Sequence, residues 1–163
     1  MKDLTLVFCR RVADGGTKEI LLGKKKRGFG LGKWNGFGGK VEAGETIVAA
    51  AQRELLEESF VTAKHLSLRG VLTFNVPSYP STMRVYVYEA VEYSGEPSES
   101  EEMRPQWFNE AQLPHKEMWA DDAYWMPMFL SGKFFRGEFD YGDEEKIVRH
   151  TLRELPCMEA LHA

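Results

Sequence analysis

The sequence predicts an α+β fold of the α-β-α sandwich type, in which a mixed β-sheet is flanked by helices. Three observations predict it. Apolar stretches of strand length recur along the chain, and two segments have the spacing of a helix. The strands occur in runs that these two segments interrupt, which places the helices against the faces of a sheet. The length of 163 residues suits one domain with a sizeable core, so a single domain is expected over residues 1–163.

The first half of the chain contains two expected strands and one helix. The segments 4–12 and 19–22 are expected to form strands, and the turn "ADGGT" between them favours a hairpin. A basic, glycine-rich loop, "GKKKRGFGLGKWNGFGGK", follows the hairpin. The helix is expected over 46–59, because Thr46 is a suitable N-cap before a stretch with helical apolar periodicity.

The second half of the chain returns to strands. Two long β patterns, "LRGVLTFNV" at 68–76 and "MRVYVYEAV" at 83–91, are joined by a connection that contains prolines. The polar, turn-rich stretch "YSGEPSESEEMRP" at 93–105 is expected to be a surface loop. The last expected elements are a helix over 123–130, which contains Pro127, and a closing strand pair over 133–141 and 146–155.

Composition excludes several classes of protein. The formal net charge of −4 argues against a protein that binds nucleic-acid polymers or membranes through charge. The apolar stretch over 4–9 is too short for a signal or membrane segment, and the sequence contains no phosphate-binding P-loop motif. Of the two cysteines, Cys9 lies in an apolar run, which favours a reduced, cytoplasmic protein over a disulfide scaffold. A nuclear or mitochondrial fraction is left open, and a monomer is expected.

The stretch "RELLEES", residues 53–59, gathers negative charge. In a helix, Glu54, Glu57 and Glu58 stand at i, i+3 and i+4 and therefore share one face. One interpretation is a solvated acidic surface. The helical wheel favours another, because Glu54 and Glu58 lie in the same arc as apolar residues, where unpaired negative charge is costly. Carboxylate oxygens alone indicate Mg²⁺, with Mn²⁺ as the alternative, rather than zinc.

The region around these glutamates resembles a known family motif. In "GKVEAGETIVAAAQRELLEESFV", Gly39 is followed by Glu45 six positions later, then by the pairs 53–54 and 57–58. This pattern resembles the Nudix box, G-x5-E-x7-R-E-U-x-E-E-x-G-U, where U is aliphatic. The resemblance implies a Nudix fold and hydrolysis of a nucleoside diphosphate linked to a further group. Phe60 stands where the motif has the glycine that normally ends the helix.

The resemblance also implies roles for the charged residues of the box. Divalent cations held by Glu54, Glu57, Glu58 and the carbonyl of Gly38 would neutralise phosphate oxygens and activate a water molecule. Glu45 and Arg53 would form a buried pair that holds the helix and its glutamates in place. The catalytic set implied by the motif is Glu54, Glu57, Glu58, Arg53 and Glu45.

Segments outside the box extend the resemblance to one group within the Nudix family. The stretches "KKRGFG", "GKWNGFGGKV", "SEEMRPQWF", "MWADDAYW" and "HTLREL" resemble the animal-type oxidised purine nucleoside triphosphatases, although "WADD" lacks that group's usual proline. These enzymes cleave 8-oxo-dGTP, and often 2-hydroxy-dATP, to the monophosphate and pyrophosphate. The substrate-binding residues that this resemblance implies are Thr5, Lys25, Phe29, Asn35, Phe74, Met83, Glu102, Met103, Trp119, Asp121, Asp122 and Trp125.

Asp121 and Asp122 have a chemical rationale as readers of a purine edge. Crowding two carboxylates raises the pKa of one of them, so the pair can share a proton and offer both a donor and an acceptor. A proton that changes position would let one pocket accept either oxidised guanine or oxidised adenine.

Each of these residues also has a simpler interpretation. The two aspartates precede a helix and could cap it, and Asn35 in a glycine-rich loop could be a turn residue. The aromatic residues Trp119, Trp125 and Phe74 could belong to the core. The run "KKKR" could be a solvated basic surface.

Two rival functions remain open from the sequence. The first is hydrolysis of another Nudix substrate, such as ADP-ribose, a dinucleoside polyphosphate or a capped RNA, which the segments "WADD" and "KWNGFGGK" argue against. The second is a Nudix module that binds nucleotides without cleaving them, which the complete set of box glutamates argues against. The leading hypothesis is a Mg²⁺-dependent pyrophosphohydrolase of oxidised purine nucleoside triphosphates, acting on a small-molecule substrate.

Overall fold

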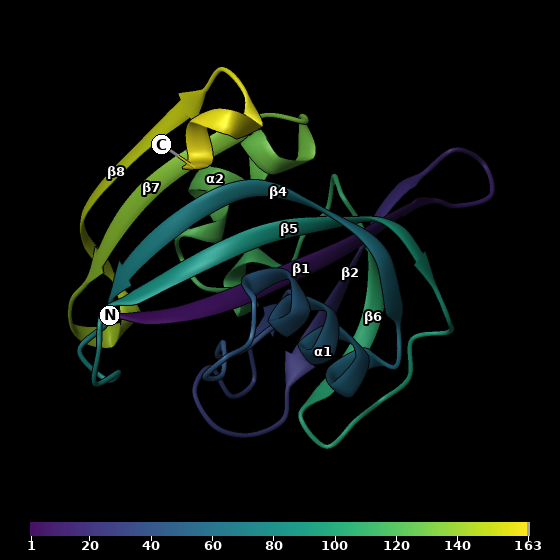
Figure 1. The fold of residues 1–163 in the computed structure, drawn as a ribbon, viewed down its shortest axis with the longest axis horizontal. Helices are drawn as coiled ribbons and strands as arrows, with labels where there is room; N and C mark the ends of the chain where they lie inside the picture. Colours follow the sequence, from purple (N-terminus) through teal and green to yellow (C-terminus); the bar gives the residue numbers. More distant parts are fainter. Residues whose placement is uncertain (163) are drawn as a thin grey trace.

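The computed structural model describes residues 1–162, whose central feature is a mixed sheet in the order β3-β2-β1-β5-β4-β7-β8, with β6 also paired to β2 (Figure 1). Two α-helices, α1 (Ile47–Ser59) and α2 (Asp122–Leu130), pack against it. No helix among these residues has both the length and the apolar character needed to cross a membrane. The strands are β1 Lys2–Val12, β2 Lys18–Lys25, β3 Trp34–Asn35, β4 Thr62–Asn75, β5 Met83–Ser94, β6 Met103–Asn109, β7 Phe134–Tyr141 and β8 Ile147–Leu155.

The sheet combines parallel and antiparallel pairs, as expected for a mixed sheet. β1 is antiparallel to β2, with Arg10 opposite Ile20, and parallel to β5. β4 is antiparallel to β5 and parallel to β7, and β7 is antiparallel to β8. The predicted N-terminal hairpin and closing strand pair are therefore confirmed.

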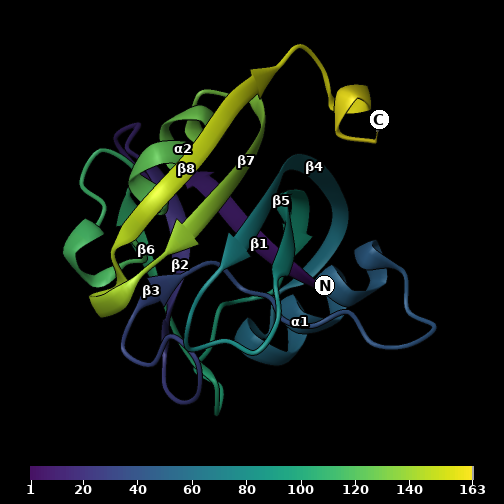
Figure 2. The same cartoon turned by 90° about the vertical axis from the view of Figure 1, so that its left-hand side faces the viewer.

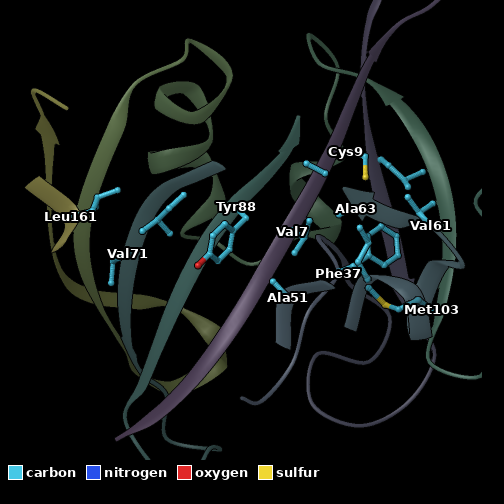
Figure 3. Packing of buried hydrophobic residues seen from close by; sticks show 14 of the residues in the cluster. Val7, Cys9, Phe37, Ala51, Val61, Ala63, Val71, Tyr88, Met103 and Leu161 are labelled. Atoms are coloured by element: carbon cyan, nitrogen blue, oxygen red, sulfur yellow. The ribbon is translucent and has the colours of Figure 1, made fainter. Parts of the chain in front are cut away.

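Alternate residues of the central strands point to opposite faces of the sheet and form two cores. Val7 and Cys9 of β1 belong to the core beneath α1, which Figure 3 shows from close by. Phe8, between them, belongs to the core beneath α2. Figure 2 shows the two helices on opposite sides of the strands. This arrangement is the predicted α-β-α sandwich.

The structure makes three main corrections to the expected strands, besides extending 4–12 to Lys2–Val12 and 19–22 to Lys18–Lys25. β4 begins at Thr62, six residues before the expected 68–76. The expected loop over 93–105 contains the end of β5 and the start of β6. β3 and β6 were not expected at all. β6 contains Pro105, which argues against a central strand, but β6 pairs with β2 alone and so lies at an edge, where proline is tolerated.

The expected helix over 46–59 is confirmed as α1 with Thr46 as its N-cap. The Thr46 hydroxyl accepts a hydrogen bond from the Ala49 amide at 3.1 Å. At the other end, Phe60 adopts the left-handed conformation with φ 65°, and its amide donates to the Leu56 carbonyl. Phe60 therefore ends the helix in the backbone conformation that glycine adopts most readily.

Candidate active site

The three glutamates of α1 lie in different surroundings. Glu58 is 4 % exposed, and its Oε1 accepts a hydrogen bond from the Gly38 amide at 2.9 Å. Burial raises the pKa of Glu58 to about 8, against the effect of the Gly38 hydrogen bond, and the Glu54 carboxylate adds to the increase. Burial also raises the pKa of Glu54, whereas the Glu57 side chain is 58 % exposed. Two of the three predicted carboxylates therefore face inward.

Arg53 connects the outer side of this acidic group to the loop before α1. Its Nε and Nη2 donate to the two oxygens of Glu45 at 2.7 and 3.0 Å, and Nη1 donates to Glu54 and Glu57 at 2.9 and 3.3 Å. The hydrogen bonds from Arg53 lower the pKa of Glu45 to about 2. The predicted pair is thus formed. It is not fully buried as expected, because Glu45 follows an exposed turn and the Arg53 side chain remains 25 % exposed.

The glycine segment 36–39 fits closely between β1 and α1. The Thr5 amide of β1 donates to the Gly39 carbonyl at 2.9 Å. A Cβ on Gly38 would lie 1.7 Å from the Thr5 carbonyl oxygen, and one on Gly39 would lie 2.6 Å from Oε1 of Glu54. The backbone at Gly38 therefore approaches β1 to a distance that no side chain would allow, and a side chain at Gly39 would displace the Glu54 carboxylate.

The acidic group fits a divalent cation, although its glutamates are not gathered around one point. Among residues 1–162, no three His, Cys, Asp or Glu side chains converge closely enough to hold an ion as they stand. Glu54 and Glu58 supply oxygen ligands whose buried negative charge a hard cation would neutralise. Glu57 bonds Arg53 and would have to turn from it to join them.

A cavity of about 270 Å³ extends from Glu58 and Gly38 to the N-terminal end of α2. Leu4, Thr5 and Leu6 of β1 contribute to its wall. Most of the rest of the wall comes from the segment 25–40, from β4, β5 and β6, from the residues around the start of α2 and from the end of β7. The residues expected to bind substrate or metal that line this cavity are Thr5, Lys25, Phe29, Asn35, Gly38, Glu58, Phe74, Met83, Met103, Trp119, Asp121 and Asp122.

Asp121 and Asp122 line the same cavity as Glu58, and both are buried. Oδ2 of Asp121 accepts a hydrogen bond from Nε1 of Trp125 at 2.7 Å, and Oδ1 accepts one from the Tyr141 hydroxyl. Burial raises the pKa of Asp121, and burial together with the Asp121 charge raises that of Asp122 well above its usual range. Asp121 makes no side-chain capping bond to α2, so the capping interpretation is wrong for it.

An aromatic wall borders the aspartates. The ring of Phe29 stacks on Trp119 with centroids 5.1 Å apart, and Tyr79 meets Phe29 edge-on at 5.2 Å. The ammonium of Lys33 lies 4.8 Å from the centroid of Trp119. Flat apolar surfaces and a nearby cation are suited to a planar, electron-rich ligand such as a purine.

Two residues predicted to bind substrate lie outside the cavity. Trp125 is fully buried and stacks on Phe135 at 5.6 Å, so the core interpretation is correct for it. Its face could not be predicted, because α2 is apolar around its circumference. Glu102 lies in a surface recess, where it pairs with Arg27 at 2.8 Å and Lys25 at 3.4 Å.

Two simpler interpretations are also decided by the structure. Asn35 belongs to β3 and lines the cavity, so it is not an ordinary turn residue; its Oδ1 accepts a hydrogen bond from the Gly36 amide at 2.9 Å. The basic run is divided: Lys25 lines the cavity, whereas Lys26 is exposed and bonds Glu99 at 2.6 Å.

Several cavity residues were missing from the sequence prediction, among them Lys33, Tyr79 and Tyr141. The Tyr79 hydroxyl is buried without a hydrogen-bond partner among the described residues. Tyr141 could have been identified as inward-facing from the alternation in "FFRGEFDY". Its position beside Asp121 depends on how β7 and α2 pack, which alternation does not reveal.

The structure thus combines a mixed sheet between helices with an acidic helix beside a cavity of about 270 Å³. The model of the NUDIX domain matches residues 5–129, and the chain belongs to the Nudix family.

Relatives with assigned activities cover most of the chain. It is 49% identical over 138 residues to a mouse protein named oxidized purine nucleoside triphosphate hydrolase, covering 85% of this chain and 88% of that protein. It is 52% identical over 136 residues to a zebrafish protein of the same name, covering 83% and 87%. Among solved structures, a MutT protein from Bacillus halodurans is similar with a TM-score of 0.77 and 26% identity, covering 93% of this chain and 97% of that one.

Proposed function

We propose that this protein is a Mg²⁺-dependent pyrophosphohydrolase that cleaves oxidised purine nucleoside triphosphates, such as 8-oxo-dGTP and 2-hydroxy-dATP, to the monophosphate and pyrophosphate. The observation that carries the proposal is one cavity lined both by Glu58 and by the buried aspartate pair. The names of the mouse and zebrafish relatives support the same substrate class. The proposal includes a single domain acting as a monomer in the cytoplasm, where it would remove oxidised nucleotides from the pool.

The acidic end would hold the triphosphate through a cation. Glu54, Glu58 and the Gly38 carbonyl would bind Mg²⁺ or Mn²⁺, with Glu57 as a further ligand. A bound cation of this kind neutralises phosphate oxygens and lowers the pKa of a water molecule. Arg53 positions Glu54 through the hydrogen bond described above, whereas Glu57 would have to leave Arg53 to bind the cation.

The part of the cavity lined by the aromatic residues and the aspartates would select the base. The aromatic wall of Trp119 and Phe29 provides apolar contact for a purine face. Asp122 has a buried Oδ2 without a partner among residues 1–162, and a hydrogen-bonding base edge would satisfy it. A site built from such groups rejects a base that leaves them unpaired, because the desolvated polar atoms then cost free energy.

The test is a pyrophosphate-release assay over a panel of nucleotides, with Mg²⁺ and with EDTA. We expect Mg²⁺-dependent release from 8-oxo-dGTP with kcat/KM at least about tenfold above that for dGTP, equivalent to about 1.4 kcal/mol. ADP-ribose and a dinucleoside polyphosphate serve as the competing substrates. Preference for either, or equal rates on dGTP and its oxidised form, would reject the proposed substrate class. No hydrolysis of any nucleotide, with binding retained, would instead identify a binding module.

A further inference from the structure

Tyr141, the last residue of β7, forms two hydrogen bonds with Asp121. Its hydroxyl oxygen accepts from the Asp121 amide at 3.0 Å, and its hydroxyl proton is donated to Oδ1 of Asp121. The ring is buried and meets Trp119 edge-on, with centroids 5.6 Å apart. Tyr141 therefore contacts both the polar and the aromatic parts of the cavity.

The hydrogen bonds of Asp121 define it as an acceptor. An indole nitrogen is a donor only, so the bond from Trp125 requires Oδ2 of Asp121 to accept. The Tyr141 oxygen already accepts the amide proton of Asp121, which directs its own proton to Oδ1. With a donor on each oxygen, the ionised form of Asp121 is favoured.

Asp122 is then the member of the pair that holds the proton. Two carboxylates in contact within a buried site do not both ionise, because their repulsion is poorly screened there. Asp122 adjoins Asp121, whose charge raises the pKa of Asp122, while the Lys33 charge opposes this increase; Lys33 also pairs with Glu145 at 3.3 Å. Oδ2 of Asp122 has no partner among residues 1–162 and is available to a ligand in the cavity.

We propose that Tyr141 is a specificity-determining residue, whose hydroxyl holds Asp121 as the acceptor of the pair and thereby keeps the shared proton on Asp122. This inference rests on the proposed function for its consequence. The edge of 8-oxoguanine presents an acceptor at O6 and donors at N1 and N2. The edge of 2-hydroxyadenine presents a donor at N6 and an acceptor at O2. A proton fixed on Asp122 matches the donors and acceptors of only one of these two bases, whereas a proton that moves between the aspartates can match both. Tyr141 therefore narrows the choice of base.

The position of the proton can be measured without any substrate. Carbon-13 NMR of the aspartate carboxyl carbons, assigned with Asp121→Asn and Asp122→Asn, reports ionisation in the wild type and in Tyr141→Phe. We expect an ionised Asp121 and a neutral Asp122 at neutral pH in the wild type. In Tyr141→Phe, the Asp121 signal should move toward the neutral form. A neutral Asp121 in the wild type would overturn the proposal, even if the variant does not fold.

The consequence for base choice is measured by kinetics. In Tyr141→Phe, the ratio of kcat/KM for 8-oxo-dGTP to kcat/KM for 2-hydroxy-dATP should move about tenfold closer to 1. A tenfold change is the effect expected from losing a hydrogen bond to a charged group. Tyr93→Phe is the matched control, because the Tyr93 hydroxyl donates to the Arg10 carbonyl at a distance of 2.8 Å and neither residue lines the cavity. This control variant should leave the ratio unchanged.

The outcomes separate this proposal from the proposed function. If Tyr141→Phe slows both substrates alike and the NMR signals of Asp121 and Asp122 do not change, Tyr141 is a structural residue and the proposal is wrong. If the wild type cleaves neither oxidised nucleotide, the proposed function is wrong. The NMR measurement alone then decides whether Tyr141 places the proton on Asp122.

Discussion

Glu58→Gln is expected to stabilise the metal-free protein at alkaline pH. Glutamine keeps the size of the side chain and a carbonyl oxygen that can accept the Gly38 amide, now bonded to Glu58 at 2.9 Å. It cannot ionise. In the absence of a cation, the wild type alone must therefore place a negative charge beside Glu54 in a buried position.

The magnitude follows from the pKa of Glu58, which burial raises from 4.5 to about 8. Because the folded state holds this proton more tightly than the unfolded state, its contribution to stability is fully present below pH 4.5 and is lost as the pH rises toward 8. The complete loss corresponds to about 5 kcal/mol. Since the site opens into a cavity that water can enter, we expect about 2–3 kcal/mol.

Urea unfolding in EDTA at pH 5 and pH 8.5 measures this effect. Stability of the wild type should fall relative to Glu58→Gln by about 2–3 kcal/mol between the two pH values. The matched control is Glu57→Gln, at an exposed position of the same helix, which should follow the wild-type curve. Saturating Mg²⁺ at pH 8.5 should stabilise the wild type more than Glu58→Gln. Parallel pH dependences of the wild type and Glu58→Gln in EDTA would refute the reasoning.

Three further changes test other parts of the site. Arg53→Ala should lower both Tm and kcat at neutral pH, and the difference in Tm should shrink as the pH falls from 4.5 toward 2, where Glu45 becomes protonated and the pair contributes less; a Tm equal to that of the wild type would contradict it. Phe60→Gly should relieve the left-handed conformation and leave stability equal or higher by up to about 1 kcal/mol, measured by urea unfolding; a loss above that amount would show that the Phe60 ring contributes to packing. Asp122→Asn should change the ratio of kcat/KM for 8-oxo-dGTP to 2-hydroxy-dATP, and a variant that slows all substrates alike would exclude Asp122 from base selection.

The acidic half of the site could be predicted from the sequence because its geometry is local. The spacing of Glu54 and Glu58 places them on one helical face whatever the rest of the fold is. The motif also relates Arg53 to Glu45 within one short segment. The same spacing leaves Glu57 outside the apolar arc, in agreement with its exposed side chain.

The base-binding half depends on contacts between distant segments, which a single sequence specifies less directly. Trp125 was expected in the cavity and lies in the core, because an all-apolar helix has no periodicity that identifies its inward face. Tyr141 was missed because it meets Asp121 only through the packing of β7 against α2. β6 was missed because polar residues and Pro105 obscure its first positions.

The close fit of the glycine segment has a consequence for how this protein tolerates substitution. Gly38 and Gly39 are fixed by lack of space, since any Cβ there would overlap β1 or Glu54. Gly28 and Gly32 have open space and are restricted only by φ of +75° and +83°, a conformation that asparagine also adopts. In a saturation library selected for activity, the first two positions should retain glycine alone, whereas the second two should also admit asparagine. Substitutions would then be tolerated in the loop that carries Phe29 of the aromatic wall, while the segment that supports the acidic helix stays unchanged.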